Sequence, residues 1–191
     1  EAERRKRYPL LKGHDLSGVV ANPASAGPRG SSEKPGKGSL MTYDMIATID
    51  AEWFNRNAPK VFDVAAAQAG QEFNRGQEAF KELVKEIGVP NLEKRELFRG
   101  VFDGRYKLVR YFGLGHYNLP ASVPRLLADN DVALYDLLLD SEEMDNLANP
   151  AHPKYDEKLL AAMNQKLNAL IAEEIGEDKA MFTPPAKDQR K

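Results

Sequence analysis

The sequence predicts an α+β domain: a small antiparallel sheet of about four strands, packed against a long C-terminal helix, with a helical insertion after the first strand. Three observations predict it. A hairpin signal surrounds Asp103-Gly104, and apolar residues at helical spacing run from Leu159 to Ile175. The remaining strand connections are too short for parallel crossovers, except across the insertion, so the strands are expected to be antiparallel.

The first strand is expected at residues 39–44, where apolar and polar side chains alternate. Met41, Tyr43 and Met45 fall on one side and Thr42 and Asp44 on the other. Because alternate side chains of a strand point to opposite faces, the pattern predicts that the face with Met41 and Tyr43 is the buried one.

The helical insertion is expected in two parts. Residues 50–66 contain large apolar side chains but are broken by Pro59, which favours an irregular, partly helical segment. Between residues 68 and 87 the apolar residues recur at spacings of seven, three and four, which predicts an amphipathic helix. Gly88 is expected to end it, and Pro90 prevents its continuation.

The remaining elements follow the insertion. A hairpin is expected at residues 97–112 with Asp103-Gly104 as its turn, and the apolar run 132–138 predicts a further strand. The C-terminal helix is expected at residues 154–175, ended by Gly176. Residues 22–38 have the composition of a flexible loop, and residues 177–191 that of a disordered tail.

Composition excludes several classes of function. The 191 residues are 42% hydrophobic and 29% charged, as in soluble globular proteins. The absence of cysteine excludes disulfides, thiolate metal sites and a cysteine nucleophile within these residues. A formal net charge of −2 provides no general field for nucleic acid. No signal peptide or membrane span is visible in these residues, which says nothing about export if the chain is a fragment.

The segment from Val132 to Ala148 resembles the C-terminal signature of type I sulfatases, the arylsulfatase-like branch of the alkaline phosphatase superfamily. In that signature a strand similar to Leu134-Tyr-Asp136 precedes an acidic Asp-x-x-Glu turn and then Asn-Leu-Ala. The acidic turn corresponds here to residues 140–143, and Asn-Leu-Ala to residues 146–148.

Two more segments extend the resemblance to roughly residues 10–175. Residues 11–20 are similar to the family's Pro-Gly-x-x-Leu-x-Pro-Leu-Leu passage, although Lys12 and Gly18 stand where proline is common. Residues 98–112 are similar to its Arg-x-x-Arg-Tyr-Lys-Leu strand pair. The resemblance implies that residues 1–38 close a catalytic domain and continue as a loop, and that residues 39–176 form the sulfatase C-terminal domain.

The resemblance implies that the parent protein hydrolyses sulfuric esters. Its formylglycine nucleophile and divalent cation, usually calcium, would lie in a missing N-terminal catalytic domain, which would be the main partner of this chain. No catalytic residue and no metal ligand is expected here, and the chain alone should be inactive. The identity of the small sulfate ester stays open. So do a phosphatase or phosphotransferase of the same superfamily, and a self-standing binding module without catalysis.

Three residues are candidates for the rim of a substrate cleft. His116 lies in the loop 113–121, and C-terminal loops of the family can reach the active-site cleft. Arg105 and Lys107 are expected on the hairpin face opposite Tyr106 and Leu108, where cations could meet a sulfate ester. A solvated sheet face is the alternative for these two cations.

Other motifs favour structural interpretations. In the sulfatase family the formylglycine nucleophile is made from the Cys or Ser of a Cys/Ser-x-Pro-x-Arg motif. Ser122-Val-Pro-Arg125 is the only near match to that motif, and it is better explained as a helix start with Pro124 in the first turn. The acidic residues of 136–145 lack calcium-loop spacing and favour a capped turn. The histidines have no His-x-x-His spacing, and His14 and His152 are expected to be solvated.

Overall fold

The computed structural model describes residues 16–23, 30, 33–45, 49–69, 73–114 and 119–176. It shows an α+β fold built on a four-stranded antiparallel sheet, as the sequence predicts. The strands lie side by side in sequence order: β1 (Ser39–Tyr43), β2 (Leu97–Phe102), β3 (Tyr106–Phe112) and β4 (Asp131–Asp136).

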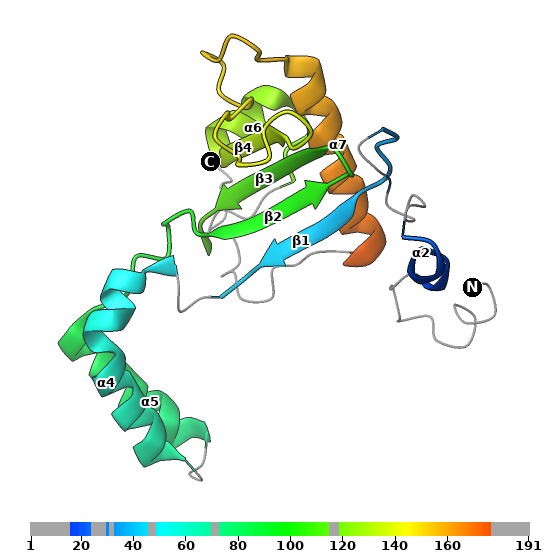
Figure 1. Cartoon of the computed structure of the whole chain (residues 1–191). Helices are drawn as coiled ribbons and strands as arrows, with labels where there is room; N and C mark the ends of the chain where they lie inside the picture. Colours follow the sequence, from blue (N-terminus) through cyan, green and yellow to red (C-terminus); the bar gives the residue numbers. More distant parts are fainter. Residues whose placement is uncertain are drawn as a thin grey trace.

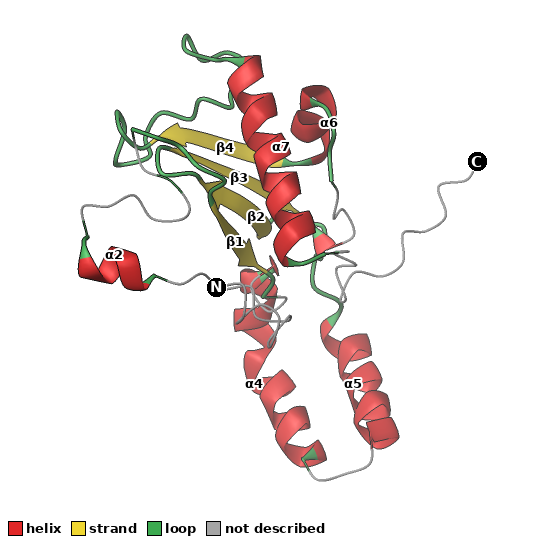
Figure 2. Ribbon diagram, turned by 90° about the vertical axis from the view of Figure 1, so that its right-hand side faces the viewer, coloured by secondary structure: helices red, strands yellow, loops and turns green. Residues whose placement is uncertain are grey.

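Two helices cover one side of the sheet. The long helix α7 (Glu157–Glu174) contacts β1, β2 and β3, and the short helix α6 (Val123–Asp129) contacts β4 and α7. Figure 2 shows α6 and α7 on the same side of the four strands. A five-residue helix, α2 (Ser17–Ala21), lies apart from them near the N-terminal end (Figure 1).

The main core lies between the sheet and α7. Leu108 and Leu134 of the sheet and Leu160 and Leu167 of α7 have no exposed surface. Burial of each such leucine contributes roughly 1.5–3 kcal/mol before ordering entropy is subtracted. Asp156 caps α7 by accepting hydrogen bonds from the first-turn amides, as the acidic start of the predicted helix suggests.

The alternation predicted for β1 is only partly seen: Met41 and Tyr43 are partly buried and Thr42 is exposed, but the strand reaches the main core through Leu40. In the β1–β2 register Leu40 pairs with Val101 on the side of α7, and Leu40 packs against the main core. Met41 and Tyr43 therefore point to the opposite face. One apolar residue is enough for β1 to contribute to the core, because it is an edge strand.

The β2–β3 hairpin is confirmed, but its turn is one residue later than predicted. The Asp103 amide donates to the Tyr106 carbonyl, so Gly104 and Arg105 are the two central residues. Gly104 has φ +101° and occupies the first central position, where a type II′ turn needs glycine. Asp103 instead accepts hydrogen bonds from the amides of Arg105 and Tyr106 and pairs with Lys166 of α7 at 2.5 Å.

The insertion is a pair of helices that projects from the sheet (Figure 1). Helix α4 (Ala51–Gln68) continues through Pro59, so the predicted irregular, partly helical segment is instead one regular helix. Pro59 removes the hydrogen bond to the carbonyl of Asn55, and both residues are exposed, so water can satisfy that carbonyl. Helix α5 (Phe73–Ile87) begins later than predicted and, as predicted, is followed by Gly88, which has φ +75°.

Candidate functional site

Arg105, a candidate for the rim of the substrate cleft, forms an ion pair within the domain. Its Nη2 lies 2.6 Å from Asp136 Oδ2, and its Nε lies 3.0 Å from Asp136 Oδ1. This pairing lowers the pKa of the Asp136 carboxyl and raises the pKa of the Arg105 guanidinium, which also lies 4.8 Å from the centre of the Tyr106 ring. Asp136 lies on the α7 face of the sheet with Leu134, so its partner Arg105 is held on that face. Lys107 lies on the other face. The prediction that the two cations share one face was therefore wrong.

Lys107 is also ion-paired. It points away from α7, as predicted, and its Nζ lies 2.7 Å from both carboxylate oxygens of Glu143. Glu143 has φ +57°, the only positive φ of a non-glycine residue in the described part of the chain. Such a backbone costs of order 1 kcal/mol or more, and it places the carboxylate over the sheet beside Lys107.

Asn146 joins the same acidic turn to strand β4. Its Oδ1 accepts hydrogen bonds from the amides of Leu134 and Ala148, and its Nδ2 donates to the carbonyl of Val132, each at 3.0 Å. We call Arg105, Lys107, Asp136, Glu143 and Asn146 the signature clip. Its polar groups hold the hairpin, β4 and the acidic turn together.

The third rim candidate, His116, lies outside the described residues. Arg105 precedes β3 and residues 115–118 follow it, so the hairpin turn and this segment are separated by a seven-residue strand. At about 3.3 Å per residue such a strand is about 23 Å long. The structure therefore does not bring Arg105 close to the ends of the loop that contains His116.

A buried pair of arginines lies under α7 at the end of the sheet next to that loop, and the sequence analysis missed it. Arg99 and Arg110 face each other in the β2–β3 register and are 4% and 0% exposed. Arg110 Nη1 donates to Asn164 Oδ1 at 2.9 Å and to Asn168 Oδ1 at 2.8 Å. Arg99 Nη1 donates to Asp44 Oδ1 at 2.6 Å.

The two asparagines also fix the chain beyond the loop. Asn164 and Asn168 both donate through Nδ2 to the carbonyl of Pro120, at 2.7 and 3.0 Å. The network thus connects β3, α7 and the segment that leads into α6. The sequence does contain a signal that could have predicted this network. The alternation of side chains along a strand places Arg99 on the same face as Val101, and Arg110 on the same face as Leu108.

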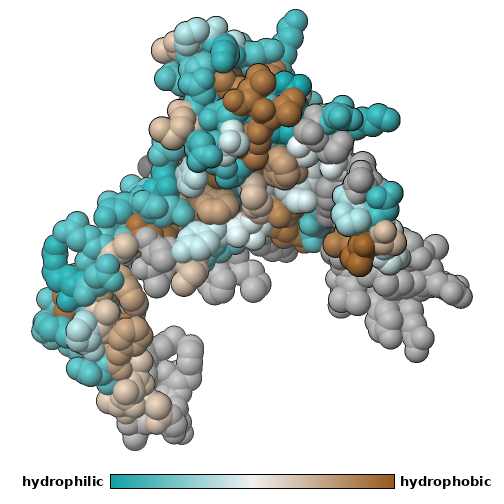
Figure 3. All heavy atoms as spheres, in the orientation of Figure 1, coloured by the Kyte–Doolittle hydropathy of each residue, from teal (hydrophilic) through white to brown (hydrophobic). Residues whose placement is uncertain are grey.

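The face of the sheet opposite α7 carries an aromatic cluster. The Tyr43 and Phe98 rings are stacked with centroids 5.6 Å apart, and Tyr111 meets Phe98 edge-on at the same distance. Met41, Phe102 and Tyr135 lie on the same face and, like the three rings, are partly exposed. Figure 3 shows this face of the molecule, in the orientation in which α7 lies behind the sheet.

The remaining motifs have structural roles. Ser122 is the N-cap residue of α6 and Pro124 lies in its first turn, which confirms the helix start. Asp140 accepts hydrogen bonds from the amides of Met144 and Asp145 at 3.0 and 2.9 Å, which confirms the capped acidic turn. The described residues contain no group of three or more His, Cys, Asp or Glu arranged to hold a metal ion.

The prediction that His152 is solvated was wrong. Its side chain is only 17% exposed, its Nδ1 accepts a hydrogen bond from the Lys154 amide at 3.1 Å, and its Nε2 lies 3.4 Å from Asp145 Oδ1. These contacts with Lys154 and Asp145 hold the imidazole against the neighbouring turns, which local sequence signals did not indicate. His14, the remaining histidine, lies outside the described residues.

Comparisons of the chain with protein-family models, with curated proteins and with solved structures found no match. Among the described residues, no helix is both long and apolar enough to cross a bilayer.

Proposed function

We propose that this chain is the C-terminal part of a sulfatase, and that it has no catalytic activity by itself. The proposed parent protein hydrolyses a small sulfuric ester. Its fold would place these residues as an α+β subdomain against an alkaline-phosphatase-like catalytic domain that precedes them in the chain.

The observation that carries the proposal is that, within the described part of the chain, helices cover only one side of the sheet. Tyr43, Phe98 and Tyr111 form a partly exposed aromatic cluster on the opposite face, and Met41 and Phe102 extend it. Aromatic side chains gathered on one partly exposed face are typical of a protein contact surface. A catalytic domain packed there would cover this second face of the four-stranded sheet.

The signature clip supports the same proposal. Two segments that separately resemble the sulfatase family, residues 98–112 and 132–148, are joined by the pairs Arg105–Asp136 and Lys107–Glu143. A chance likeness in two distant segments gives no reason for their charged residues to pair. The signature clip also explains why these charged residues occur together: they hold the hairpin to β4 and the acidic turn, and this role needs no contact with a substrate.

The nucleophile and the cation belong, in this proposal, to the preceding domain. A formylglycine there would supply the attacking hydrate, and a divalent cation, usually calcium in the family, would stabilise charge on the ester. The residues of this chain would support the cleft from outside. With Arg105 and Lys107 already ion-paired, the loop 113–121 with His116 is the segment we propose for the cleft rim.

The proposal is tested by expressing the longest reading frame that contains this chain, together with a formylglycine-generating enzyme. The product should hydrolyse an aryl sulfate such as p-nitrophenyl sulfate, and the 191-residue chain alone should not. Phosphate monoesters and diesters serve as competing substrates. A longer product that cleaves only phosphate esters would replace the sulfatase by a phosphatase, and a longer product without either activity would contradict the proposal.

A further inference from the structure

The sheet has two edge strands, β1 and β4, and the strand registers show which backbone groups lie on each edge. Along an antiparallel pair, residues that exchange two hydrogen bonds alternate with residues whose N–H and C=O groups point away from the partner. The tight turn makes Asp103 and Tyr106 a hydrogen-bonded pair. Counting from this pair, the residues at odd positions of β1 bond to β2, and Leu40 and Thr42 direct their N–H and C=O groups outward.

The β4 edge is closed by the chain itself. The same counting makes Val132 and Leu134 the residues of β4 with outward backbone groups, and independent hydrogen bonds agree with it. Asn146 contacts the Leu134 amide and the Val132 carbonyl, each at 3.0 Å, and the Leu147 amide donates to the Leu134 carbonyl at 2.8 Å. These contacts occupy the positions that a further strand would need.

The β1 edge differs from the β4 edge. No described residue forms a hydrogen bond with the outward N–H and C=O groups of Leu40 and Thr42. Natural sheets protect an edge strand with charged side chains, proline or a bulge. β1 reads Ser-Leu-Met-Thr-Tyr, without charge or proline, and all five residues pair with β2 in an unbroken register. The β1 edge is therefore one that a further strand can extend.

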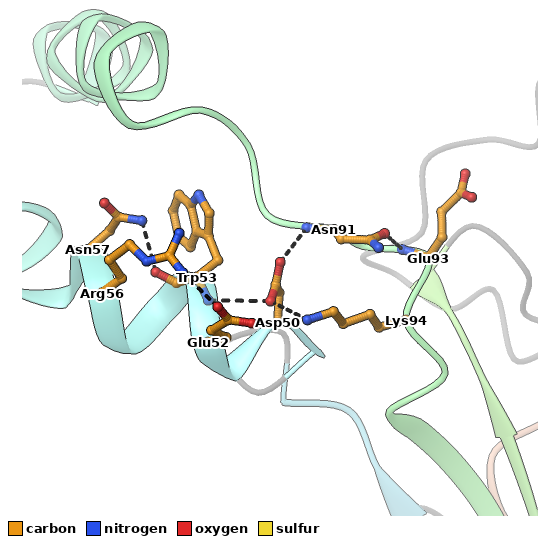
Figure 4. A network of polar contacts seen from close by, with 8 residues as sticks. All are labelled: Asp50, Glu52, Trp53, Arg56, Asn57, Asn91, Glu93 and Lys94. Carbon is orange, nitrogen blue, oxygen red and sulfur yellow. Dashed lines mark hydrogen bonds and ion pairs between the residues drawn. The ribbon is translucent and has the colours of Figure 1, made fainter.

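Helices α4 and α5, which follow β1 in the chain, form an arm that extends beyond the end of β1 and not along its edge (Figures 1 and 2). The base of the arm is held by Asp50, which is 9% exposed (Figure 4). The Asp50 carboxylate accepts hydrogen bonds from the amides of Trp53 and Asn91 and pairs with Lys94 Nζ at 2.6 Å. The Lys94 ammonium and these amides lower the pKa of Asp50 to about 2. The start of α4 is thereby tied to the segment that leads into β2, which keeps the arm away from the β1 edge.

An extended polypeptide matches the outward groups of β1. Leu40 and Thr42 are about 7 Å apart along the strand, and each presents a donor beside an acceptor. A strand laid beside β1 has the complementary groups at the same repeat, whatever its side chains are. The edge is also continuous with the aromatic face of the sheet, because Met41 and Tyr43 of β1 belong to that face. A protein domain that covers the aromatic face therefore also lies next to the β1 edge.

We propose that the β1 edge is a strand-docking site: an extended segment of the catalytic domain pairs with Leu40 and Thr42 and continues the sheet into that domain. This contact rests on the proposed function, which supplies the partner domain. A segment of the same polypeptide is favoured over a free peptide or a second copy, because the covalent link raises its effective concentration to about the millimolar range.

The test is hydrogen exchange, resolved amide by amide over residues 39–43, of the 191-residue chain and of the longer product described under the proposed function. In the 191-residue chain the outward amides of Leu40 and Thr42 should exchange at least roughly 10-fold faster than those of Met41 and Tyr43, which bond to β2. In the longer product the exchange of the two outward amides should slow by at least roughly 10-fold, because the docked strand accepts their hydrogen bonds.

Thr42→Pro and Thr42→Val are the paired variants of the longer product. Proline removes the outward N–H of residue 42 and obstructs an added strand, but it leaves the bonds between β1 and β2 in place; valine keeps the N–H. The Leu40 amide should lose its protection in Thr42→Pro and keep it in Thr42→Val. The amides of Met41 and Tyr43 should stay protected in both variants, which shows that β1 is still paired with β2.

Hydrolysis of p-nitrophenyl sulfate by the same longer product separates the two proposals. An active product whose outward amides exchange as fast as in the 191-residue chain would overturn the strand-docking site and leave the sulfatase proposal standing. An inactive product whose outward amides gain protection would contradict the sulfatase proposal and support docking of a strand from the preceding residues. Outward amides that are already protected in the 191-residue chain, and more so at higher protein concentration, would assign the β1 edge to a second copy and overturn the proposal. Equal protection of Leu40 in the two variants would overturn it as well.

Discussion

Replacing Asn146 with alanine should destabilise the domain more than its position in a surface turn suggests. The side chain makes three hydrogen bonds of 3.0 Å, to the amides of Leu134 and Ala148 and to the carbonyl of Val132. Strand β4 is an edge strand, so the two bonds to Leu134 and Val132 satisfy groups that no neighbouring strand reaches. At a net value near 1 kcal/mol each, Asn146→Ala should lower the free energy of unfolding by about 3 kcal/mol.

The measurement is urea denaturation followed by circular dichroism at 25 °C. Asn149→Ala is the matched control, because its Oδ1 accepts one hydrogen bond, from the Ala151 amide, in an exposed turn. The control should lose about 1 kcal/mol or less. Asn146→Asp keeps the two acceptor contacts but turns an oxygen toward the Val132 carbonyl, and should fall between wild type and Asn146→Ala. If Asn146→Ala stays within 0.5 kcal/mol of wild type, roughly the experimental error, the structural reading of the signature clip is refuted.

Three further outcomes follow from the same structure. Leu167→Ala in the core should lower the free energy of unfolding, measured by urea denaturation, by about 2–5 kcal/mol. Leu139→Ala, at a 75% exposed site, should change it by less than about 0.5 kcal/mol. Equal losses of unfolding free energy in the two variants would contradict the assigned core. Because the folded pKa of Asp50 is about 2, below its ordinary 3.8, its stabilisation of the arm is complete above about pH 4 and is lost as pH falls toward 2. Trp53 fluorescence should follow that loss, and Asp50→Asn should remove the transition from this pH range. In the proposed parent enzyme Lys107→Met should leave kcat/KM within about twofold of wild type, since Lys107 is ion-paired to Glu143; a larger fall would restore Lys107 to the cleft rim.

The fold was predictable where side-chain pattern and local chemistry agree. The helix from Asp156 to Gly176 has an N-cap, an apolar stripe and a terminal glycine, and all three signals point to the same boundaries. Helix α4 was missed because Pro59 was given more weight than the cap at Asp50, and only the structure shows that the carbonyl left by Pro59 faces water.

The functional residues were harder to predict, because the partner of a charge is set by tertiary contact. Lys107 and Glu143 are 36 positions apart, and the sequence alone does not show that they meet. The buried arginine Arg110 was missed for the same reason. Its acceptors, Asn164 and Asn168, lie on the stripe of α7 that the hydrophobic pattern assigned to apolar packing.

The most direct test of the central claim is the coding sequence upstream of Glu1. We predict several hundred in-frame residues that contain a Cys/Ser-x-Pro-x-Arg motif and Asp-rich metal ligands, which would make this chain the C-terminal part of a sulfatase. A start codon and promoter directly ahead of Glu1 would contradict the account. The domain would then be a binding module, and the aromatic face of its sheet would need a different partner.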